Sequence, residues 1–369
     1  MHVLQICHCY YPPFLDCARQ YAVLFKGTGI KVTTVYLTGE PDPAVEQATC
    51  SDEVIFLGYK SNEVSGLKLD AIRRIRKIVA AKPYLFCIAH RSKPTYLALM
   101  ATKLPVVSVR HSFNEFDRFS RRFLMNVFRK RLLILAVSNA VRDEIRAALP
   151  NWPHEKIETL YNHIDVDAVR NGLLTREAAR EHLGLPESAW VMANVGRLHP
   201  DKDQATLIRA FAKALPNLPK ESLLLLMGAG PLEQNLKQLT KDLGIEKQVI
   251  FTGQVSDGRR YFKAFDIFVL TSDHEPFGMV LLEAMAADLP IICSNCGGGA
   301  EVVGDVGLLF EFGNVSELSE VMLQMTHDGA GCSGEKLRMW LNVTFSDQAA
   351  RGRFLELSIL KKYSARGHT

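Results

Sequence analysis

Residues 271–301 constrain the fold of this chain more than any other stretch. They read TSDHEPFGMVLLEAMAADLPIICSNCGGGAE and follow a short apolar run at residues 266–270, which has the length of a buried parallel strand. An Ala-rich helix former occupies residues 279–287, and a second short apolar run at residues 289–293 leads into consecutive glycines. This order of strand, helix, strand and Gly-rich loop predicts a parallel α/β sheet.

Two carboxylates accompany the predicted helix. The helix begins near Gly278, where unpaired backbone N–H groups and the positive end of the helix dipole suit a phosphate or a sugar hydroxyl. Glu275 precedes the helix and Glu283 lies inside its apolar run, where a carboxylate is costly unless it has a partner. The alternatives are an exposed helix position for Glu283 and an ordinary N-terminal charge for Glu275.

Length and composition predict a globular protein of two domains. The chain has 369 residues, 47% hydrophobic and 23% charged. We expect no transmembrane helix, because no apolar run reaches the required length, and no signal peptide, because the start MHVLQICHCYYPP lacks a basic segment and an apolar core. Eight cysteines without framework spacing indicate a reducing compartment, and we expect no metal or redox role for the single C-x-x-C at Cys293 and Cys296.

The charge is unevenly distributed. The net charge is +4, but residues 1–165 carry +8 and the remainder carries −4. A basic first half predicts an anionic partner on that side, which would be a phosphorylated acceptor, an anionic membrane surface, or both.

Strands alternate with helices through the first half, which predicts a doubly wound parallel sheet. The expected strands are residues 2–7, 31–37, 54–57, 84–89, 106–109 and, as the last of this half, 132–137. Ligands bind such sheets beyond the carboxyl ends of the strands. Arg19, His90 and His111 follow such ends or open the next helix, although a lone histidine there is often a structural hydrogen-bonding group.

A basic and aromatic segment covers residues 115–131. Helical spacing puts many of its aromatic side chains on one face. They either line the core beneath a solvated basic face, or contact a membrane surface or a phosphate-rich acceptor. The basic residues are Arg118, Arg121, Arg122, Arg129, Lys130 and Arg131. Nucleic acid is the less favoured partner, because the sequence contains no recognition module.

In the second half, Arg197 and Lys202 bracket a strand-to-helix turn, where two cations can neutralise a diphosphate. Solvated surface charges are the alternative. The G-A-G at residues 228–230 lacks the third glycine of a dinucleotide fingerprint, so a nicotinamide dehydrogenase is not expected. The D-x-D at Asp165 and Asp167 lies in a linker, so we interpret it as accidental rather than as a metal site.

The segments HEPFGMVLLEAMA, NVGRLHPDKDQATLIRAFA and LPVVSVRHS resemble glycosyltransferase family 4 (group 1), a family of retaining glycosyltransferases with the GT-B architecture. Glu275 and Glu283 match its E-x7-E signature. The resemblance implies two Rossmann-like, doubly wound parallel-sheet domains that face each other across a cleft. Residues 1–165 would bind the acceptor and residues 166–346 the nucleotide sugar, with residues 347–369, including a final helix over 347–362, packing back on the first domain.

The resemblance also implies site roles. Arg197 and Lys202 would hold the donor diphosphate, Glu283 the ribose, and Glu275 the donor sugar, while His111 would face the reacting sugar. Further donor contacts would come from Val255, Phe277, Gly278, Met279 and Val280. The family needs no divalent metal and no cofactor besides the nucleotide sugar.

The chain departs from the family pattern at two turns. The loop after the first strand is PPFLDCARQ, without the family's Gly-Gly pair, so Asp16, Arg19 and His90 are the candidates for the acceptor side of the site. In LYNHID, His163 stands where the family often has glycine, and histidine tolerates positive φ.

The leading hypothesis is therefore a retaining, metal-independent hexosyltransferase. It would use UDP-glucose or another UDP-hexose and build lipopolysaccharide core as a cytoplasmic enzyme at the inner membrane. The alternatives are a GT-B-fold UDP-sugar epimerase, a GDP-sugar-dependent transferase of exopolysaccharide or O-antigen synthesis, and an inactive sugar-nucleotide-binding subunit. The complete set of Arg197, Lys202, Glu275 and Glu283 argues against the last of these.

Overall fold

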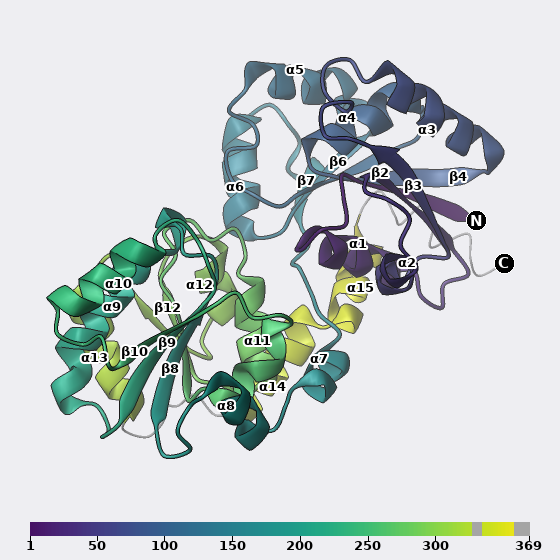
Figure 1. Ribbon diagram of the computed structural model, residues 1–369. Helices are drawn as coiled ribbons and strands as arrows, with labels where there is room; N and C mark the ends of the chain where they lie inside the picture. The colour runs from purple at the N-terminus through teal and green to yellow at the C-terminus, as the bar shows by residue number, and fades with distance from the viewer. Residues whose placement is uncertain (327–333, 358–369) are drawn as a thin grey trace. The chain divides into compact units, whose positions relative to one another are not determined.

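The computed structural model describes residues 1–326 and 334–357 and divides the chain into two compact α/β units (Figure 1). Domain 1 comprises Met1–His163 and the C-terminal segment that begins at Asp347, and domain 2 comprises Ile164–Ser346. The first crossing between the units therefore lies two residues before the boundary that the sequence suggested.

Domain 1 contains a seven-stranded sheet of order β3-β2-β1-β4-β5-β6-β7, in which every neighbouring pair is parallel. The strands are β1 (His2–Cys7), β2 (Lys31–Thr38), β3 (Glu53–Tyr59), β4 (Tyr84–His90), β5 (Val106–Arg110), β6 (Leu132–Ala136) and β7 (Ile157–Thr159). The expectation that residues 132–137 form the last strand of this half is wrong. β7 follows, and its three residues carry too little periodic signal to be recognised in the sequence.

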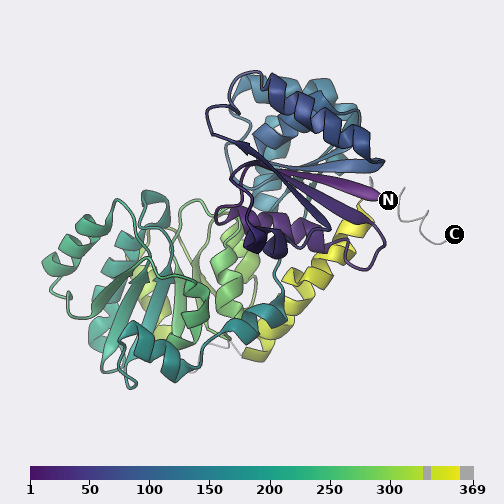
Figure 2. The same ribbon diagram turned by 45° about the vertical axis from the view of Figure 1, so that its right-hand side comes forward.

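Helices cover both faces of this sheet. They are α1 (Phe14–Val23), α2 (Pro43–Thr49), α3 (Leu69–Ala81), α4 (Ser92–Ala101), α5 (Phe119–Phe128), α6 (Asn139–Ala148) and α15 (Asp347–Glu356), with 3-10 turns η1 (Arg129–Arg131) and η2 (His154–Lys156). In both views α1 and α2 lie on one side of the sheet, and α3, α4 and α5 lie on the other (Figures 1 and 2). This arrangement follows from right-handed crossovers that run outward from β1 in both directions.

The C-terminal helix α15 is part of the domain 1 core. Ala350 and Phe354 are buried, and the Phe354 ring lies edge-on to the rings of Tyr21 and Phe25 on the α1 side. Burying one such phenylalanine contributes about 1.5–3 kcal/mol. The expected helix over 347–362 is observed as Asp347–Glu356, and residues 358–362 lie outside the described part of the chain.

A partly buried ionic contact fixes the start of α15. Arg19 on α1 donates two hydrogen bonds to the Asp347 carboxylate, at 2.9 and 3.0 Å, and His163 Nδ1 lies 2.7 Å from the same group. Arg19 therefore holds the returning chain, and its place on the acceptor side of the site stays a prediction. The positive φ suggested for His163 is also wrong. Its place in the turn is secured by this side-chain contact.

Domain 2 contains a six-stranded parallel sheet of order β10-β9-β8-β11-β12-β13. The strands are β8 (Trp190–Val195), β9 (Ser222–Met227), β10 (Val249–Gly253), β11 (Ile267–Leu270), β12 (Ile291–Ser294) and β13 (Leu308–Phe310). The central strands β8, β9, β11 and β12 are apolar along nearly their whole length, as expected for strands covered by helices on both faces.

The helices of domain 2 are α7 (Val166–Gly172), α8 (Arg176–Leu183), α9 (Gln204–Ala214), α10 (Glu233–Asp242), α11 (Met279–Ala286), α12 (Gly297–Val303), α13 (Val315–Thr326) and α14 (Gly334–Phe345), with 3-10 turns η3 (Pro200–Lys202), η4 (Leu215–Asn217) and η5 (Gly258–Ala264). Asp165 caps α7 by accepting a hydrogen bond from the Ala168 backbone N–H at 2.9 Å. This capping role accounts for the first carboxylate of the D-x-D without a metal. Within the described residues, none of the helices combines the length and apolarity needed to cross a bilayer.

Candidate active site

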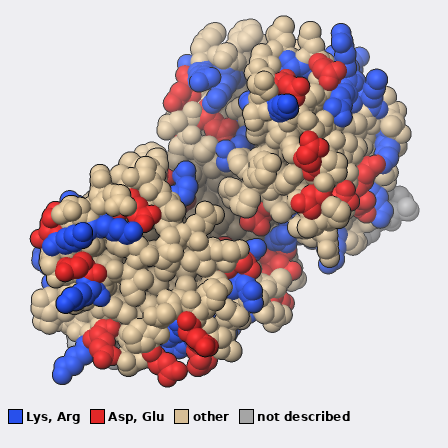
Figure 3. All heavy atoms as spheres, viewed as in Figure 1, with Lys and Arg blue, Asp and Glu red and all other residues tan. Residues whose placement is uncertain are grey.

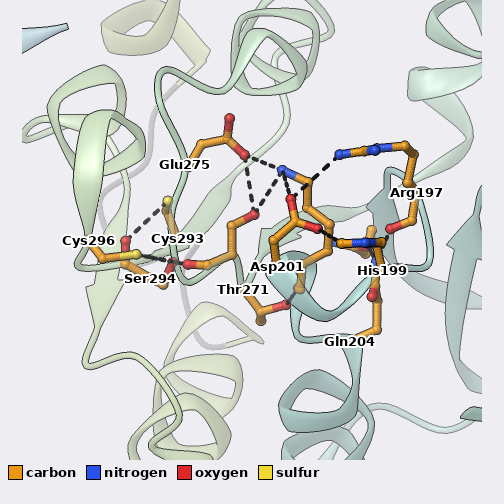
Figure 4. A network of polar contacts seen from close by, with 12 residues as sticks. Arg197, His199, Asp201, Gln204, Thr271, Glu275, Cys293, Ser294 and Cys296 are labelled. Carbon is orange, nitrogen blue, oxygen red and sulfur yellow. Dashed lines mark hydrogen bonds and ion pairs between the residues drawn. The ribbon is translucent and has the colours of Figure 1, made fainter. Parts of the chain in front are cut away.

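The segments after β8, β11 and β12, at the carboxyl end of the domain 2 sheet, build one polar network (Figure 4). The loop after β8 and the Gly-rich loop after β9 touch through their backbones. A Cβ added at Gly228 would lie 1.9 Å from the Gly196 carbonyl oxygen, and one at Gly230 would lie 2.3 Å from that of Leu198. The G-A-G sequence is thus explained by the close approach of two loops, not by dinucleotide binding.

Lys202 and Glu275 meet at the centre of this network. Lys202 Nζ lies 2.6 Å from Glu275 Oε2 and 3.4 Å from Ser272 Oγ, and both charged side chains are mostly buried, with 17% and 12% of their surface exposed. The Ser272 hydroxyl also lies 3.3 Å from the same carboxylate oxygen. Separating a buried pair of this kind is costly unless each charge gains a new partner, because an uncompensated charge would otherwise be left buried.

The Glu275 loop is positioned by glycines. Gly298 N donates a hydrogen bond to the Glu275 carbonyl at 2.7 Å, and a Cβ at Gly297, where φ is +59°, would lie 2.5 Å from that oxygen. Cys296 Sγ contacts the Ser272 carbonyl oxygen at 2.8 Å, and both cysteines of the C-x-x-C are free thiols. The C-x-x-C therefore supports the loop that carries Glu275.

Arg197 lies at the open side of the network. Its side chain is 73% exposed, and its guanidinium is 3.7 Å from the Asp201 carboxylate. Asp201 also contacts His199. Burial raises the pKa of Asp201, but the His199 contact and the charges of Lys202 and Arg197 outweigh it and lower that pKa overall. The side chains of Arg197, Asp201 and Glu275 point toward one another (Figure 4). Arg197 and Lys202 lie 3.7 and 3.8 Å from the same Asp201 carboxylate oxygen, so two cations converge on one carboxylate.

The N-terminus of α11 lies directly after the Glu275 loop. Gly278 has φ of +92°, a conformation that favours glycine, and it has no side chain with which to cap the helix. Met279 and Val280 are half-buried there, whereas Phe277 is buried. Glu283 is half-buried in a helix whose following residues are buried, so it occupies the more open face of α11.

Val255 lies apart from the Lys202–Glu275 network. It lines a hollow of about 460 Å³ beside β10, together with His182 and Phe251. The structure thus brings Arg197, Lys202 and Glu275 together and places Val255 on a separate loop of the same domain.

Domain 1 presents a pair of histidines at the ends of two neighbouring strands. His90 ends β4 and His111 follows β5, with His90 Nδ1 3.1 Å from His111 Nε2 and the rings nearly parallel. Cys17 Sγ on α1 lies 3.7 Å from His111 Nδ1. Burial, followed by the charges of Arg91 and Arg110, lowers the pKa of His111 to about 3. His111 is therefore a neutral hydrogen-bonding group at neutral pH, not an imidazolium.

Arg91 stands between these histidines and the N-terminus of α4. Its backbone has φ of +68° and ψ of −178°, a region that costs a residue with a side chain about 1–3 kcal/mol. Its guanidinium lies 4.5 Å from the centre of the Phe14 ring, in the loop that lacks the family's glycines. Burial lowers the pKa of His8, and the charges of Lys93 and Arg91 lower it further. Cations thus gather at the carboxyl ends of β1 and β4.

Sequence reasoning missed three members of these clusters. Cys17 lies 94 positions from His111, and no local pattern connects them. Asp201 and Ser272 each look like ordinary polar loop residues, although Asp201 stands four positions after Arg197. Asp16, named for the acceptor side, is half-buried in the first turn of α1. Within residues 1–326 and 334–357, no cluster of three or more His, Cys, Asp and Glu side chains is arranged to hold a metal ion.

Two family profiles match the chain in succession. Residues 18–168 match the profile described as Glycosyltransferase Family 4, and residues 175–341 match the profile described as Glycosyl transferases group 1. Each of the two domains therefore matches a glycosyltransferase family profile. The resemblance drawn from the motifs is thereby confirmed at the level of these families.

Curated relatives of the chain have several different acceptors in their names. It is 31% identical over 198 residues to N-acetyl-alpha-D-glucosaminyl L-malate synthase of Bacillus anthracis, covering 53% of this chain and 50% of the relative. It is 30% identical over 252 residues to N-acetylgalactosamine-N,N'-diacetylbacillosaminyl-diphospho-undecaprenol 4-alpha-N-acetylgalactosaminyltransferase of Campylobacter jejuni, covering 64% and 66%. It is 33% identical over 153 residues to the lipopolysaccharide core biosynthesis glycosyltransferase LpsE of Rhizobium meliloti, covering 41% and 44%. The chain thus spans about half the length of the curated relatives it matches.

Solved glycosyltransferase structures share the fold. A glycosyltransferase of Rickettsia africae has a TM-score of 0.82 at 19% identity, with 98% of each chain covered. The Anabaena protein Alr3699/HepE, solved with UDP and glucose, has a TM-score of 0.76 at 20% identity, with 96% of this chain and 98% of that one covered. The expected fold class, two parallel-sheet α/β domains of the GT-B type, is confirmed.

Proposed function

We propose that this protein is a retaining, metal-independent hexosyltransferase. Its donor would be a UDP-hexose, UDP-glucose first, and its acceptor an anionic surface glycan or glycolipid, lipopolysaccharide core first. The observation that carries the proposal is the pairing of Lys202 with Glu275 beside Arg197, at the carboxyl end of the domain 2 sheet and just before the N-terminus of α11. This is the position at which open α/β sheets bind phosphorylated ligands.

The charges of the site match the charges of the reaction. Breaking the bond between the sugar and the diphosphate leaves negative charge on the phosphate oxygens and positive charge on the anomeric carbon. Fixed cations stabilise the leaving group without reorganisation, and the helix N-terminus adds to them. In the proposed course the acceptor oxygen attacks from the side that the diphosphate leaves, and the leaving phosphate takes the acceptor proton. The configuration is thereby retained, and no pair of glycosidase-type carboxylates is required.

Roles for the remaining residues follow from this course. Glu275 would accept hydrogen bonds from donor-sugar hydroxyls and Glu283 from the ribose, with Val255 near the base. His111 would face the reacting sugar as a neutral group, since its pKa of about 3 keeps it uncharged. Arg91 and Lys93, beside His90, supply the charge that an anionic acceptor needs. We place the enzyme in the cytoplasm, at the inner membrane.

The choice of donor and acceptor follows two lines of support. The structural neighbour from Anabaena was solved with UDP and glucose, so UDP-glucose is the first donor to test. The names of the relatives include L-malate and a diphospho-undecaprenol glycan, which are both anionic, and one relative is named for lipopolysaccharide core biosynthesis. These relatives are a synthase and transferases, so the epimerase hypothesis is not favoured. A GDP-sugar donor is the alternative that the experiment must separate.

The test combines a donor panel with two arginine variants. Thermal shift and turnover are measured with UDP-, GDP- and ADP-sugars, and transfer is followed as release of the free nucleoside diphosphate. Arg197→Gln changes a largely exposed side chain and is expected to lower kcat by about 10²–10³-fold, because it removes a charge-assisted contact to the leaving group. Arg209→Gln, at an exposed position of α9, is the matched control and should keep the parental rate. Parental turnover of Arg197→Gln would remove this residue from the mechanism, and stabilisation by GDP-sugars alone would overturn the choice of donor.

A further inference from the structure

Helix α5 of domain 1 carries an apolar row that faces solvent. Phe119, Phe123 and Val127 recur every four residues and therefore share one face of the helix. Their side chains are 72%, 59% and 57% exposed, and the two phenylalanine rings stack with their centres 6.1 Å apart. Met125 is the buried residue of this helix. Phe116, in contrast, is buried, so the alternative in which the stripe lines the core holds for that residue and is wrong for this row.

The surroundings of this row are basic. Residues 118–142 contain no Asp or Glu. Arg118, at the start of α5, and Arg129 and Lys130, at its end, are exposed. Arg122 donates hydrogen bonds to the carbonyls of Phe116 and Asp117, which keeps its charge beside the first turn. Lys and Arg side chains also gather over α3, on the same side of the sheet (Figure 3).

Two more of the six basic residues bond to backbone carbonyls: Arg121 donates a hydrogen bond to the Glu115 carbonyl at 2.8 Å, and Arg131 bonds to the end of α4. Arg131 donates hydrogen bonds to the carbonyl oxygens of Thr102 and Leu104, at 2.6 and 3.2 Å, and so closes the end of α4. Arg131 is therefore not part of the α5 face. The α5 face is Phe119, Phe123 and Val127 together with Arg118, Arg129 and Lys130.

We propose that the α5 face docks on an anionic lipid bilayer. The apolar row extends over about 12 Å of helix, with cations at both ends, which is the pattern of a helix that lies in the plane of a membrane interface. Anionic headgroups complement the cations, and the phenylalanines enter the boundary between headgroups and acyl chains. The acid-free run favours this occupant over a second copy of the chain, which would have to supply negative charge. The inference rests on the proposed function, under which membrane binding brings domain 1 to a lipid-linked acceptor.

The first test is co-sedimentation with vesicles of 30% phosphatidylglycerol in phosphatidylcholine. Removing three cations in Arg118→Gln/Arg129→Gln/Lys130→Gln should weaken partitioning by about 10²-fold, because each contributes roughly 1 kcal/mol near an anionic surface. Phe119→Gln/Phe123→Gln should weaken it by about tenfold or more. The parent should lose binding as salt rises from 0.1 M to 1 M, where the Debye length falls from about 10 Å to about 3 Å.

The matched control is Met339→Gln/Val343→Gln. These residues form an apolar pair with the same four-residue spacing on α14 of domain 2, with 64% and 67% exposure. Their replacement removes similar apolar surface and should leave vesicle binding unchanged. Equal partitioning of the parent and both α5 variants would overturn the proposal, and so would an equal loss in the α14 control.

A second readout tests insertion directly. Phe123→Trp places an indole in the exposed row, and its fluorescence should shift to the blue and be quenched by brominated lipid when anionic vesicles are added. Sedimentation velocity without vesicles tests whether a second copy of the chain covers the α5 face. A dimer that becomes a monomer in Phe119→Gln/Phe123→Gln would identify a second copy as the partner and would overturn the lipid proposal. Failure of the proposed function can be distinguished from failure of the membrane proposal, because the donor titration does not depend on lipid. Vesicle binding without turnover refutes the transferase, and turnover without vesicle binding refutes the α5 face.

Discussion

Domain 1 is expected to lose stability in mild acid, because folding holds several of its histidines neutral. Burial lowers the pKa of His111 to about 3, and the nearby arginine charges add to that effect. Burial, followed by the charge of His111, lowers the pKa of His90 well below its ordinary value. Burial also lowers the pKa of His163, although its contact with Asp347 acts in the opposite direction. All three groups therefore bind protons more readily in the unfolded chain.

The magnitude can be worked out for His111. An unfolded histidine has a pKa of about 6.5, so between pH 6.5 and 3 the unfolded state binds a proton that the folded state does not. Stability is therefore complete above about pH 6.5 and falls as the pH is lowered toward 3. Between pH 7 and 5 this single group lowers the free energy of unfolding by about 2 kcal/mol. His90 and His163 act in the same direction and steepen the loss.

The assay uses the tryptophan of domain 1. Trp152 is buried in domain 1, whereas Trp190 and Trp340 belong to domain 2. Replacing the latter two by phenylalanine leaves Trp152 as the single tryptophan of the chain. Urea unfolding at pH 7 and pH 5 then gives the free energy of unfolding of domain 1 at each pH.

His111→Gln in this background should reduce the pH-dependent loss by about 2 kcal/mol, because glutamine has no proton to bind. His154→Gln changes an exposed histidine of the same domain and should leave the loss as in the parent. A pH dependence between 7 and 5 that is identical in the parent and in His111→Gln would refute the neutral state of His111 in the folded domain. Such a result would also reopen a role for His111 as a titrating acid or base in the reaction.

Two further predictions concern the candidate site. Activity should persist in EDTA, because Arg197, Lys202 and the N-terminus of α11 supply the positive charge that a divalent metal would otherwise provide; loss of activity with recovery on adding Mn²⁺ or Mg²⁺ would show that this charge is insufficient. Arg91→Gly should be more stable to urea than Arg91→Ala by about 1 kcal/mol or more, because both variants lose the contact with Phe14 but only glycine relieves the backbone at φ +68°. Equal stability of the two variants would mean that the backbone relaxes when the arginine is removed.

The sequence predicted helices and strands well where the signals that define an element lie within the element itself. The run from β11 through α11 to β12 could be recognised because apolar periodicity, an Ala-rich segment and glycines all act within a few residues. The helical spacing within residues 115–131 likewise indicated a helix, which is observed as α5 over Phe119–Phe128. Whether the stripe of α5 meets the core or solvent depends on what packs against it, and no residue inside the stripe determines that.

The missed contacts join distant positions. Arg19 and Asp347 are 328 residues apart, and Cys17 and His111 are 94 apart, so neither pair has a local signal. Lys202 and Glu275 are separated by 73 residues and were associated only through the family resemblance. The charge of Arg19 was visible in the sequence, but its partner Asp347 lies on the returning C-terminal helix. The ion pair between them could therefore not be predicted from the residues around Arg19.

The pairing of Lys202 with Glu275 also has a consequence for the order of recognition under the proposed function. Lys202 is the cation that pairs with Glu275 in the mostly buried site, at 2.6 Å, whereas the Asp201 carboxylate lies farther from Lys202, at 3.8 Å. Glu275 therefore cannot turn to a ligand alone without losing its close ionic contact. A diphosphate satisfies the ammonium and so releases the carboxylate, which can then accept hydrogen bonds from sugar hydroxyls. A free hexose has hydroxyls that can donate to the Glu275 carboxylate, but it has no anion for the Lys202 ammonium. Separating the pair for a free hexose is therefore unfavourable. The site would therefore recognise the sugar only when it is carried on a diphosphate, and the specificity for an activated donor would arise from one ion pair.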